Sequence, residues 1–142
     1  MKYAPRMLAI VVTMLPLLAS AQLASSQRLV TNVPFQFRAS EKLIPAGECT
    51  VQRVGADMKT LVIQNYAGKV GAFSNPLVAE SKEASAINAL VFHKYGSQYF
   101  LSGIKLAGSK TMYKIRESRQ EAELRAQNTP ASEQTLLALL QE

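Results

Sequence analysis

The chain has 142 residues, with 16 Lys and Arg against 10 Asp and Glu, one Cys and one His. This length allows one domain, the single Cys excludes an intramolecular disulfide, and the single His excludes multi-histidine metal sites. No block of five or six like charges accompanies the net charge of +6, so the basic surplus does not indicate a nucleic-acid partner.

The first 21 residues have the pattern of a secretory signal peptide. Lys2 and Arg6 flank the start, residues 7–18 are an apolar run, and residues 19–21 (ASA) form a small-x-small cleavage site. The run is shorter than the roughly 20 residues that span a bilayer. We therefore predict cleavage after Ala21, a periplasmic or extracellular location, and no stable membrane insertion of the trimmed chain. An uncleaved anchor is the alternative.

Short runs of alternating apolar and polar residues follow, separated by turn residues. They predict about six strands, at residues 29–38, 48–54, 59–64, 70–74, 87–93 and 98–104. Residues 77–85 fit a helical turn or a loop equally well. The fold expected for residues 22–108 is therefore mainly β, as a small antiparallel sandwich or open barrel.

A β-hairpin over residues 88–104 is the clearest single element. With its tip at Tyr95-Gly96, Phe92 faces Tyr99 and Val91 faces Phe100. One face then carries Leu90, Phe92, Tyr99 and Leu101, and the other carries Ala89, Val91, His93, Gln98, Phe100 and Ser102. Because a one-residue slip would exchange the faces, we expect the first of them to pack into the core.

Residues 109–142 are predicted to be a helical C-terminal extension. Residues 113–127 are dense in helix-forming side chains. Thr129-Pro130 then has the pattern of a helix N-cap followed by proline at the first helical position. The second helix would present a narrow apolar face made of Leu136, Leu137 and Leu140.

The apolar pair Val91 and Phe100 shares its hairpin face with His93 and should be covered. Three kinds of structure could cover this pair: the terminal helix folding back, a second subunit, or a ligand or partner. We favour the first, although the terminal helix could instead pair with its own copy. The candidate interaction face therefore consists of Val91, His93, Phe100, Leu136, Leu137 and Leu140.

No catalytic set can be assembled from the sequence. His93 has no nucleophile nominated beside it, and Cys49 shares the parity of Val51, which predicts a core position. Phosphate-binding glycine loops and nucleic-acid motifs are absent from the sequence. We therefore predict no catalytic, metal-binding or cofactor-binding residues, no cofactor, and no nucleic-acid partner.

Four stretches carry a resemblance as a set: residues 33–37 (VPFQF), residues 43–51 (LIPAGECTV), residues 90–102 (LVFHKYGSQYFLS) and the Glu/Arg-rich tail. They resemble a family of short secreted β-rich proteins of unassigned function from Acidobacteria, with PF-F, LPAGEY-V and LVFHRYGD-YFL patterns. Cys49 stands where that family has an aromatic residue, and Ser97 where an acidic residue is common. The resemblance implies export and a β-domain, and it transfers no catalytic residue.

These observations favour an exported, non-catalytic β-domain that acts by binding in the cell envelope. A small barrel is the alternative, with an apolar ligand among Phe35, Phe37, Phe92, Tyr99 and Leu101, although known ligand barrels use about eight strands. The last alternative is an enzyme that uses Cys49 or His93, which requires the two side chains within hydrogen-bond reach.

Overall fold

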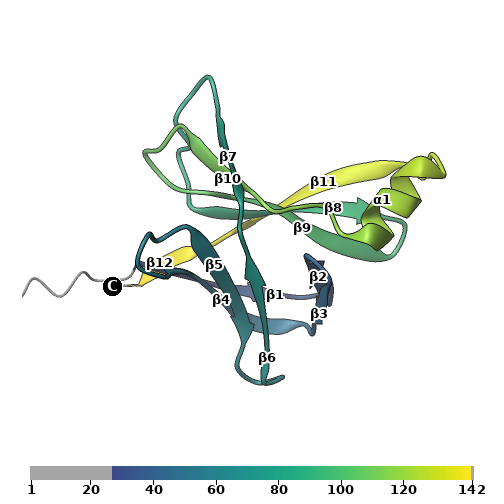
Figure 1. The fold of residues 1–142 in the computed structure, drawn as a ribbon, viewed down its shortest axis with the longest axis horizontal. Coiled ribbons are helices and arrows are strands. Elements are labelled where there is room, and N and C mark those ends of the chain that lie inside the picture. Colours follow the sequence, from purple (N-terminus) through teal and green to yellow (C-terminus); the bar gives the residue numbers. More distant parts are fainter. Residues whose placement is uncertain (1–26, 142) are drawn as a thin grey trace, which may run out of the picture.

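The computed structural model describes residues 27–141 and shows two β-sheets packed against one another, with one short helix (Figure 1). The sheets do not close into a barrel. The predicted mainly β fold is therefore confirmed. Of the two architectures predicted, sandwich and open barrel, the structure shows the sandwich. The predicted signal peptide and its cleavage site lie outside the described residues.

The smaller sheet has five antiparallel strands. Their order is β12 (Leu139–Gln141), β1 (Arg28–Val33), β4 (Gly47–Val54), β5 (Thr60–Asn65) and β6 (Val70–Ser74). Asn65 joins the turn after β5 to the chain entering β4: its Oδ1 accepts the Gly68 N–H at 2.8 Å, and its Nδ2 donates to the Pro45 carbonyl at 2.9 Å. These bonds satisfy the buried amide.

The larger sheet has the order β11 (Ala131–Leu137), β8 (Ala89–Tyr95), β9 (Gln98–Lys105), β10 (Thr111–Lys114) and β7 (Leu77–Glu80). Two short strands attach to it, because β2 (Phe37–Ala39) pairs with β3 (Lys42–Ile44) and contacts β9 in parallel. The described residues therefore form twelve strands, where the sequence predicted about six.

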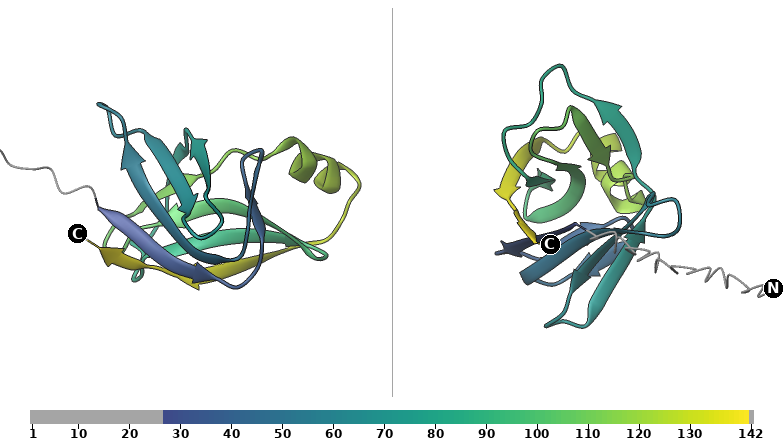
Figure 2. Two further views of the ribbon diagram at one scale, coloured as in Figure 1. Left: turned by 90° about the horizontal axis from the view of Figure 1, so that it is seen from below. Right: turned by 90° about the vertical axis from the view of Figure 1, so that its left-hand side faces the viewer.

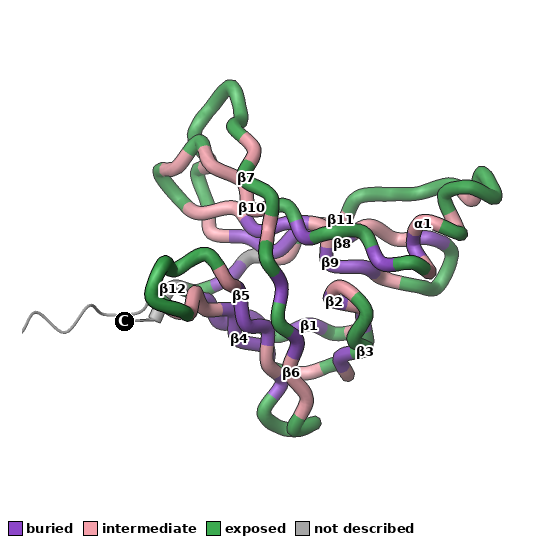
Figure 3. Tube along the Cα trace, in the orientation of Figure 1, coloured by how far each residue is buried: buried purple, intermediate pink, exposed green. Residues whose placement is uncertain are grey.

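The core lies between the inward faces of the two sheets, where the buried parts of the trace converge (Figure 3). Alternation along the strands places one face of each sheet in this core. The largest side chains with almost no exposure include Phe37, Ile44, Ile63, Phe92 and Leu101. Burying a side chain of this size contributes about 1.5–3 kcal/mol, so the packed interior stabilises the sandwich without a disulfide.

The hairpin is present as β8 and β9, but its predicted partners are wrong. Gly96 has φ +61° and occupies the loop with Ser97, so Tyr95 pairs with Gln98. Phe92 consequently faces Leu101 instead of Tyr99. A shift of two residues leaves each side chain on its face, which is why the prediction that the Phe92 face packs into the core is confirmed.

A register shift between Val91 and Phe92 changes the base of the hairpin. Val91 pairs with Gly103 and Leu90 with Ile104, so the predicted Val91–Phe100 and Leu90–Leu101 pairs do not form. Ser102 is the extra residue of this β-bulge, which increases the local twist. Leu90 nevertheless stays in the core.

The C-terminal segment differs most from its prediction. The one helix, α1 (Arg119–Ala126), is shorter than the stretch predicted to form it, and residues 113 and 114 belong to β10. The predicted terminal helix is wrong, because residues 131–141 form β11 and β12. Among the described residues, no helix has the length and apolar character needed to cross a bilayer.

The final strands replace the predicted helix because two strand edges need partners. β11 pairs with β8 in the larger sheet and β12 pairs with β1 in the smaller one, with the buried Ala138 at the change of sheet. The yellow segment can be followed along both sheets (Figure 2). This pairing outweighs the modest helix propensity of the segment, so residues 109–141 are part of the sandwich.

Candidate functional site

The predicted interaction face is only partly assembled. Val91 and Phe100 are buried and His93 is half-exposed, all away from the main core cluster. Leu136 lies against the core cluster instead, opposite Leu90. Leu137 pairs with Ala89, and Leu140 pairs with Leu29 in the other sheet, so the three leucines do not form a helical cover.

Helix α1 lies over the outer face of β8 and β9 that carries Val91 and Phe100. Glu121 of α1 contacts His93 of β8, with Oε1 and Nδ1 2.8 Å apart. Gln120 Nε2 donates to Gln98 Oε1 of β9 at 2.6 Å. Val91 and Phe100 are buried on this face, and α1 is attached to the same face through its contacts with His93 and Gln98.

Local sequence explains where α1 begins. Ser118 is the N-cap, and its Oγ accepts the Glu121 N–H at 3.1 Å. Glu41, from the turn between β2 and β3, accepts the Arg119 N–H at 2.8 Å. Both acceptors satisfy N–H groups that have no partner within the first helical turn, so the helix start is attached to the larger sheet.

An ion pair and a carboxyl–imidazole contact lie along this helix. Arg125 forms a bidentate contact with Glu117, at 2.8 and 2.9 Å, across the exposed side of α1. The Glu121 carboxyl is buried, and that burial raises its pKa, although the His93 contact lowers it in part. Burial and the Glu121 charge also raise the pKa of the Tyr95 phenol.

An open hollow, the α1 hollow, lies beneath these pairs and has a volume of about 490 Å³. Its more buried lining is Tyr95, Ile115 and Glu121, with Met112 and His93 half-buried. Its exposed rim carries charges of both signs, from Lys114, Glu117, Arg125 and Glu133. The volume falls within the range of about 300–1,000 Å³ that is typical of ligand sites.

Cys49 and the α1 hollow belong to different sheets. It is fully buried on the inner face of β4 in the smaller sheet, 3.9 Å from Asn65 Nδ2, whereas His93 lies on the outer face of the larger sheet. Burial raises the pKa of the Cys49 thiol to about 11. The predicted core position is confirmed, and the structure does not bring Cys49 and His93 together.

The aromatic residues that were candidates for an apolar ligand site pack on one another. Phe35 stacks on Tyr99 with ring centroids 3.7 Å apart, and Phe92 makes edge contacts with Phe35 and Phe37 at 5.2 and 5.1 Å. The rings thus occupy the space that the proposed ligand would need.

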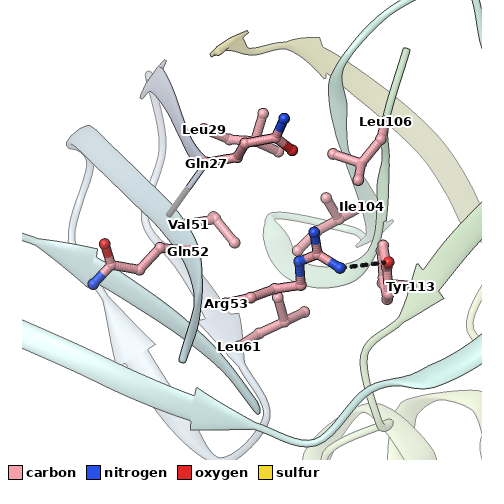
Figure 4. A pocket seen from close by; sticks show the side chains of 9 residues that line it. All are labelled: Gln27, Leu29, Val51, Gln52, Arg53, Leu61, Ile104, Leu106 and Tyr113. Atoms are coloured by element: carbon pink, nitrogen blue, oxygen red, sulfur yellow. Dashed lines mark hydrogen bonds between the residues drawn. The ribbon is translucent and has the colours of Figure 1, made fainter. Parts of the chain in front are cut away.

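A separate cavity between the sheets lies beside the Arg53–Tyr113 hydrogen bond (Figure 4). Its volume is about 20 Å³, and a single water molecule needs about 10–15 Å³ by the same measure. This cavity is lined mainly by apolar side chains, among them Leu29, Val51 and Ile104. A lipophilic ligand therefore does not fit there.

Glu121 is the main residue of the site that the sequence analysis did not single out. Residues 118–121 read Ser-Arg-Gln-Glu, which is a capping-box pattern and predicts a helix start at Ser118. In that pattern the glutamate normally bonds the backbone N–H of the cap residue, and here its carboxylate contacts His93 instead. The local sequence therefore indicates where the helix starts. It does not indicate that Glu121 contacts His93, which lies 28 residues earlier in the chain.

In the part of the chain that the structure describes, no group of three or more His, Cys, Asp and Glu side chains could hold a metal ion. The resemblance to acidobacterial secreted proteins stays a prediction. Comparisons with protein-family models, curated proteins and solved structures found no match for this chain.

Proposed function

We propose that this chain is an exported, non-catalytic binding domain that takes a peptide segment of its partner in the α1 hollow. The observation that carries this proposal is the combination of an open volume of about 490 Å³, buried side chains inside it, and charges of both signs around it. The signal-peptide pattern supports the export of the chain.

Binding is favoured over chemistry because Ser102, Glu121 and Arg125 in the hollow already have partners. Ser102 Oγ donates to the Val91 carbonyl at 3.0 Å, and the Glu121 carboxylate is 2.8 Å from His93. Arg125 holds Glu117. An activated nucleophile needs a base within hydrogen-bond reach, and here the Ser102 hydroxyl bonds a backbone carbonyl instead.

The charge pattern favours a peptide over a polyanion. Lys114 and Arg125 are balanced on the rim by Glu117 and Glu133, whereas a nucleic acid or an anionic membrane requires a surplus of cations. Tyr95, Met112 and Ile115 offer apolar contact for one or two side chains. A segment with an apolar residue between charges of opposite sign fits this arrangement.

Selection from a phage-displayed random peptide library, followed by calorimetric titration of the enriched peptides, tests the proposal. Lys114→Glu and Glu133→Lys should each weaken binding by about tenfold, which corresponds to about 1.4 kcal/mol. Lys59→Glu is the matched control, because Lys59 is an exposed lysine in the turn before β5. Enrichment of no peptide, or equal effects of all three substitutions, would contradict the proposal.

The export part has a separate test. Expression of the whole chain in a bacterium with two membranes, followed by mass spectrometry of the periplasmic fraction, should give a chain that begins at Gln22. A chain that stays in the cytoplasm with its first 21 residues attached would contradict export and leave the binding measurement unaffected.

A further inference from the structure

A second open hollow, the intersheet cleft, has a volume of about 560 Å³, within the range of about 300–1,000 Å³ that is typical of ligand sites. It is lined by Arg53 of β4, residues 57–60, residues 75 and 76, Val78 of β7 and Tyr113 of β10. Tyr113 lines this cleft, whereas its neighbour Met112 lines the α1 hollow. Because successive residues of a strand point to opposite faces, the two sites lie on opposite sides of β10.

Arg53 carries a charge that the protein does not balance. It is half-buried, and its Nη1 donates to the Tyr113 hydroxyl at 3.2 Å (Figure 4). That partner is neutral and uses one of the five N–H groups of a guanidinium. Among the described residues, the carboxylates in salt bridges are Glu117 and Glu121, with partners on α1 and β8. A partly buried charge without a counter-ion is costly, and an anionic ligand would supply one.

The other charges at the cleft offset each other. Asp57 and Lys59 are exposed and belong to the same turn, in which Asp57 Oδ1 accepts the Lys59 N–H at 3.2 Å. Arg53 therefore gives the cleft one excess positive charge. A carboxylate carries one negative charge, whereas a phosphate monoester carries about −1.5 to −2. The charge balance thus favours a carboxylate, which a guanidinium binds in bidentate geometry.

Apolar side chains line the same cleft. Val78 is 67% exposed and Met58 is 39% exposed. Met58 has φ +53°, a conformation that is uncommon for residues other than glycine and asparagine. The turn thus presents a methionine at the cleft although its backbone is better suited to those two residues. Exposed apolar side chains that gather at one place are typical of binding surfaces.

We propose that the intersheet cleft binds a small organic acid, with its carboxylate at Arg53 and its apolar body against Met58 and Val78. Tyr113 acts as a positioning residue, because its hydroxyl accepts from Arg53 and its ring centroid lies 5.8 Å from the guanidinium carbon. A guanidinium held in place before binding lowers the entropic cost of binding. This site does not depend on the peptide proposed for the α1 hollow.

Calorimetric titration of the exported chain with octanoate, and with octanamide as the neutral compound of the same length, measures the contribution of the charge. Wild type should bind octanoate at least about tenfold more tightly than octanamide, and Arg53→Gln should reduce this preference to about twofold or less. Arg116→Gln is the matched control, because Arg116 is exposed and does not line the cleft. No binding of octanoate, equal binding of the two compounds by wild type, or equal effects of the two substitutions overturns the proposal.

Methionine methyl NMR tests the location. Three of the five methionines lie in the predicted signal peptide, so the exported chain holds Met58 at the cleft and Met112 at the α1 hollow. Octanoate should shift the ¹³C-methyl resonance of Met58 and leave that of Met112 unchanged. A shift of Met112 alone would place the acid in the α1 hollow and overturn the proposal.

Met58→Asn tests the apolar contact in a variant that should fold. Asparagine adopts a positive φ more readily than methionine, so the urea unfolding midpoint should not fall. The variant should bind octanoate about fourfold or more weakly, which is the effect of losing one buried methylene contact. Unchanged affinity would overturn the placement of the apolar body at Met58.

Discussion

The Glu121 carboxylate lies 2.8 Å from the His93 ring nitrogen Nδ1 and connects α1 to the outer face of the larger sheet. The side chain of Glu121 is 6% exposed and that of His93 is 41% exposed. A buried carboxylate is costly unless it is hydrogen-bonded. The helix position therefore depends on this contact more than on the exposed Glu117–Arg125 pair, since surface ion pairs contribute little.

Replacement of Glu121 should separate its hydrogen bond from its charge. Glu121→Gln keeps a side-chain oxygen near His93 and removes a charge that burial disfavours, so thermal unfolding at neutral pH should change little. Glu121→Ala removes the hydrogen bond to the half-exposed His93 and should cost about 0.5–1.5 kcal/mol. Glu123→Ala is the control, on the exposed side of the same helix. Equal losses from Gln and Ala would show that the charge itself is required.

The pH dependence of stability follows from the raised pKa of Glu121. The folded state binds this proton more tightly than the unfolded state, in which the pKa is near 4.5. The stabilising contribution of the neutral carboxyl is thus complete below pH 4.5 and is lost as pH rises through the raised value. Urea unfolding of wild type and Glu121→Gln across this window should show a difference that changes with pH. A constant difference would contradict the assignment to Glu121.

The strands at residues 131–141 should contribute to the free energy of unfolding through their pairing in the two sheets. Leu136→Ala, in β11 against the core cluster, should lower the free energy of unfolding by about 1–3 kcal/mol, less than a fully buried leucine. Leu139→Ala should change it by less than about 0.5 kcal/mol, because that side chain is 73% exposed. Chemical denaturation of both variants measures the contrast. Equal effects would mean that β11 is not held against β8.

The hairpin shows how much of the fold could be predicted from sequence alternation. Its period of two identifies the core face, so Phe92 and Leu101 could be placed in the core. Partner identity depends on which residues form the loop, and that choice rests on the positive φ at Gly96. Alternation carries no information on that angle, which is why the faces were right and the partners were wrong.

The C-terminal strands show where local reasoning fails. Thr129-Pro130 and the leucines after it satisfy the rules for a helix start, and these rules do not include the open edges of β8 and β1. Long-range pairing decides the structure of such short apolar segments. The candidate site was affected in the same way: Val91 and Phe100 were placed on one face of the hairpin from the sequence, but the attachment of α1 to that face through His93 and Gln98 was not predicted.

Cys49 should react slowly with thiol reagents in the folded protein. Its side chain is fully buried and its thiol has a pKa of about 11, and the thiolate is the reactive form. Ellman's reagent at pH 8 should modify the native chain only at the rate of opening, and the chain in urea at once. Rapid modification of the native chain would contradict the core position of Cys49.

Gly68 and Gly103 should respond differently to alanine, because different atoms face the new methyl group. A Cβ at Gly68 lies 2.5 Å from Pro45 Cγ, in a rigid ring beside the carbonyl that Asn65 binds. At Gly103 the nearest atom is the terminal methyl of Met112, a flexible side chain that can move aside. Gly68→Ala should therefore cost about 1–3 kcal/mol, and Gly103→Ala clearly less.

A double-mutant cycle on Gly68 and Pro45 tests the cause of that cost. Pro45→Ala removes the ring atom that a Cβ at Gly68 would meet, so the two substitutions together should cost less than the sum of the single losses. The coupling should exceed about 0.5 kcal/mol, since contacting residues are not additive. Additive losses would place the origin of the Gly68 effect in the backbone of the turn and not in the contact with Pro45. Thermal or urea unfolding of the four chains decides between the two.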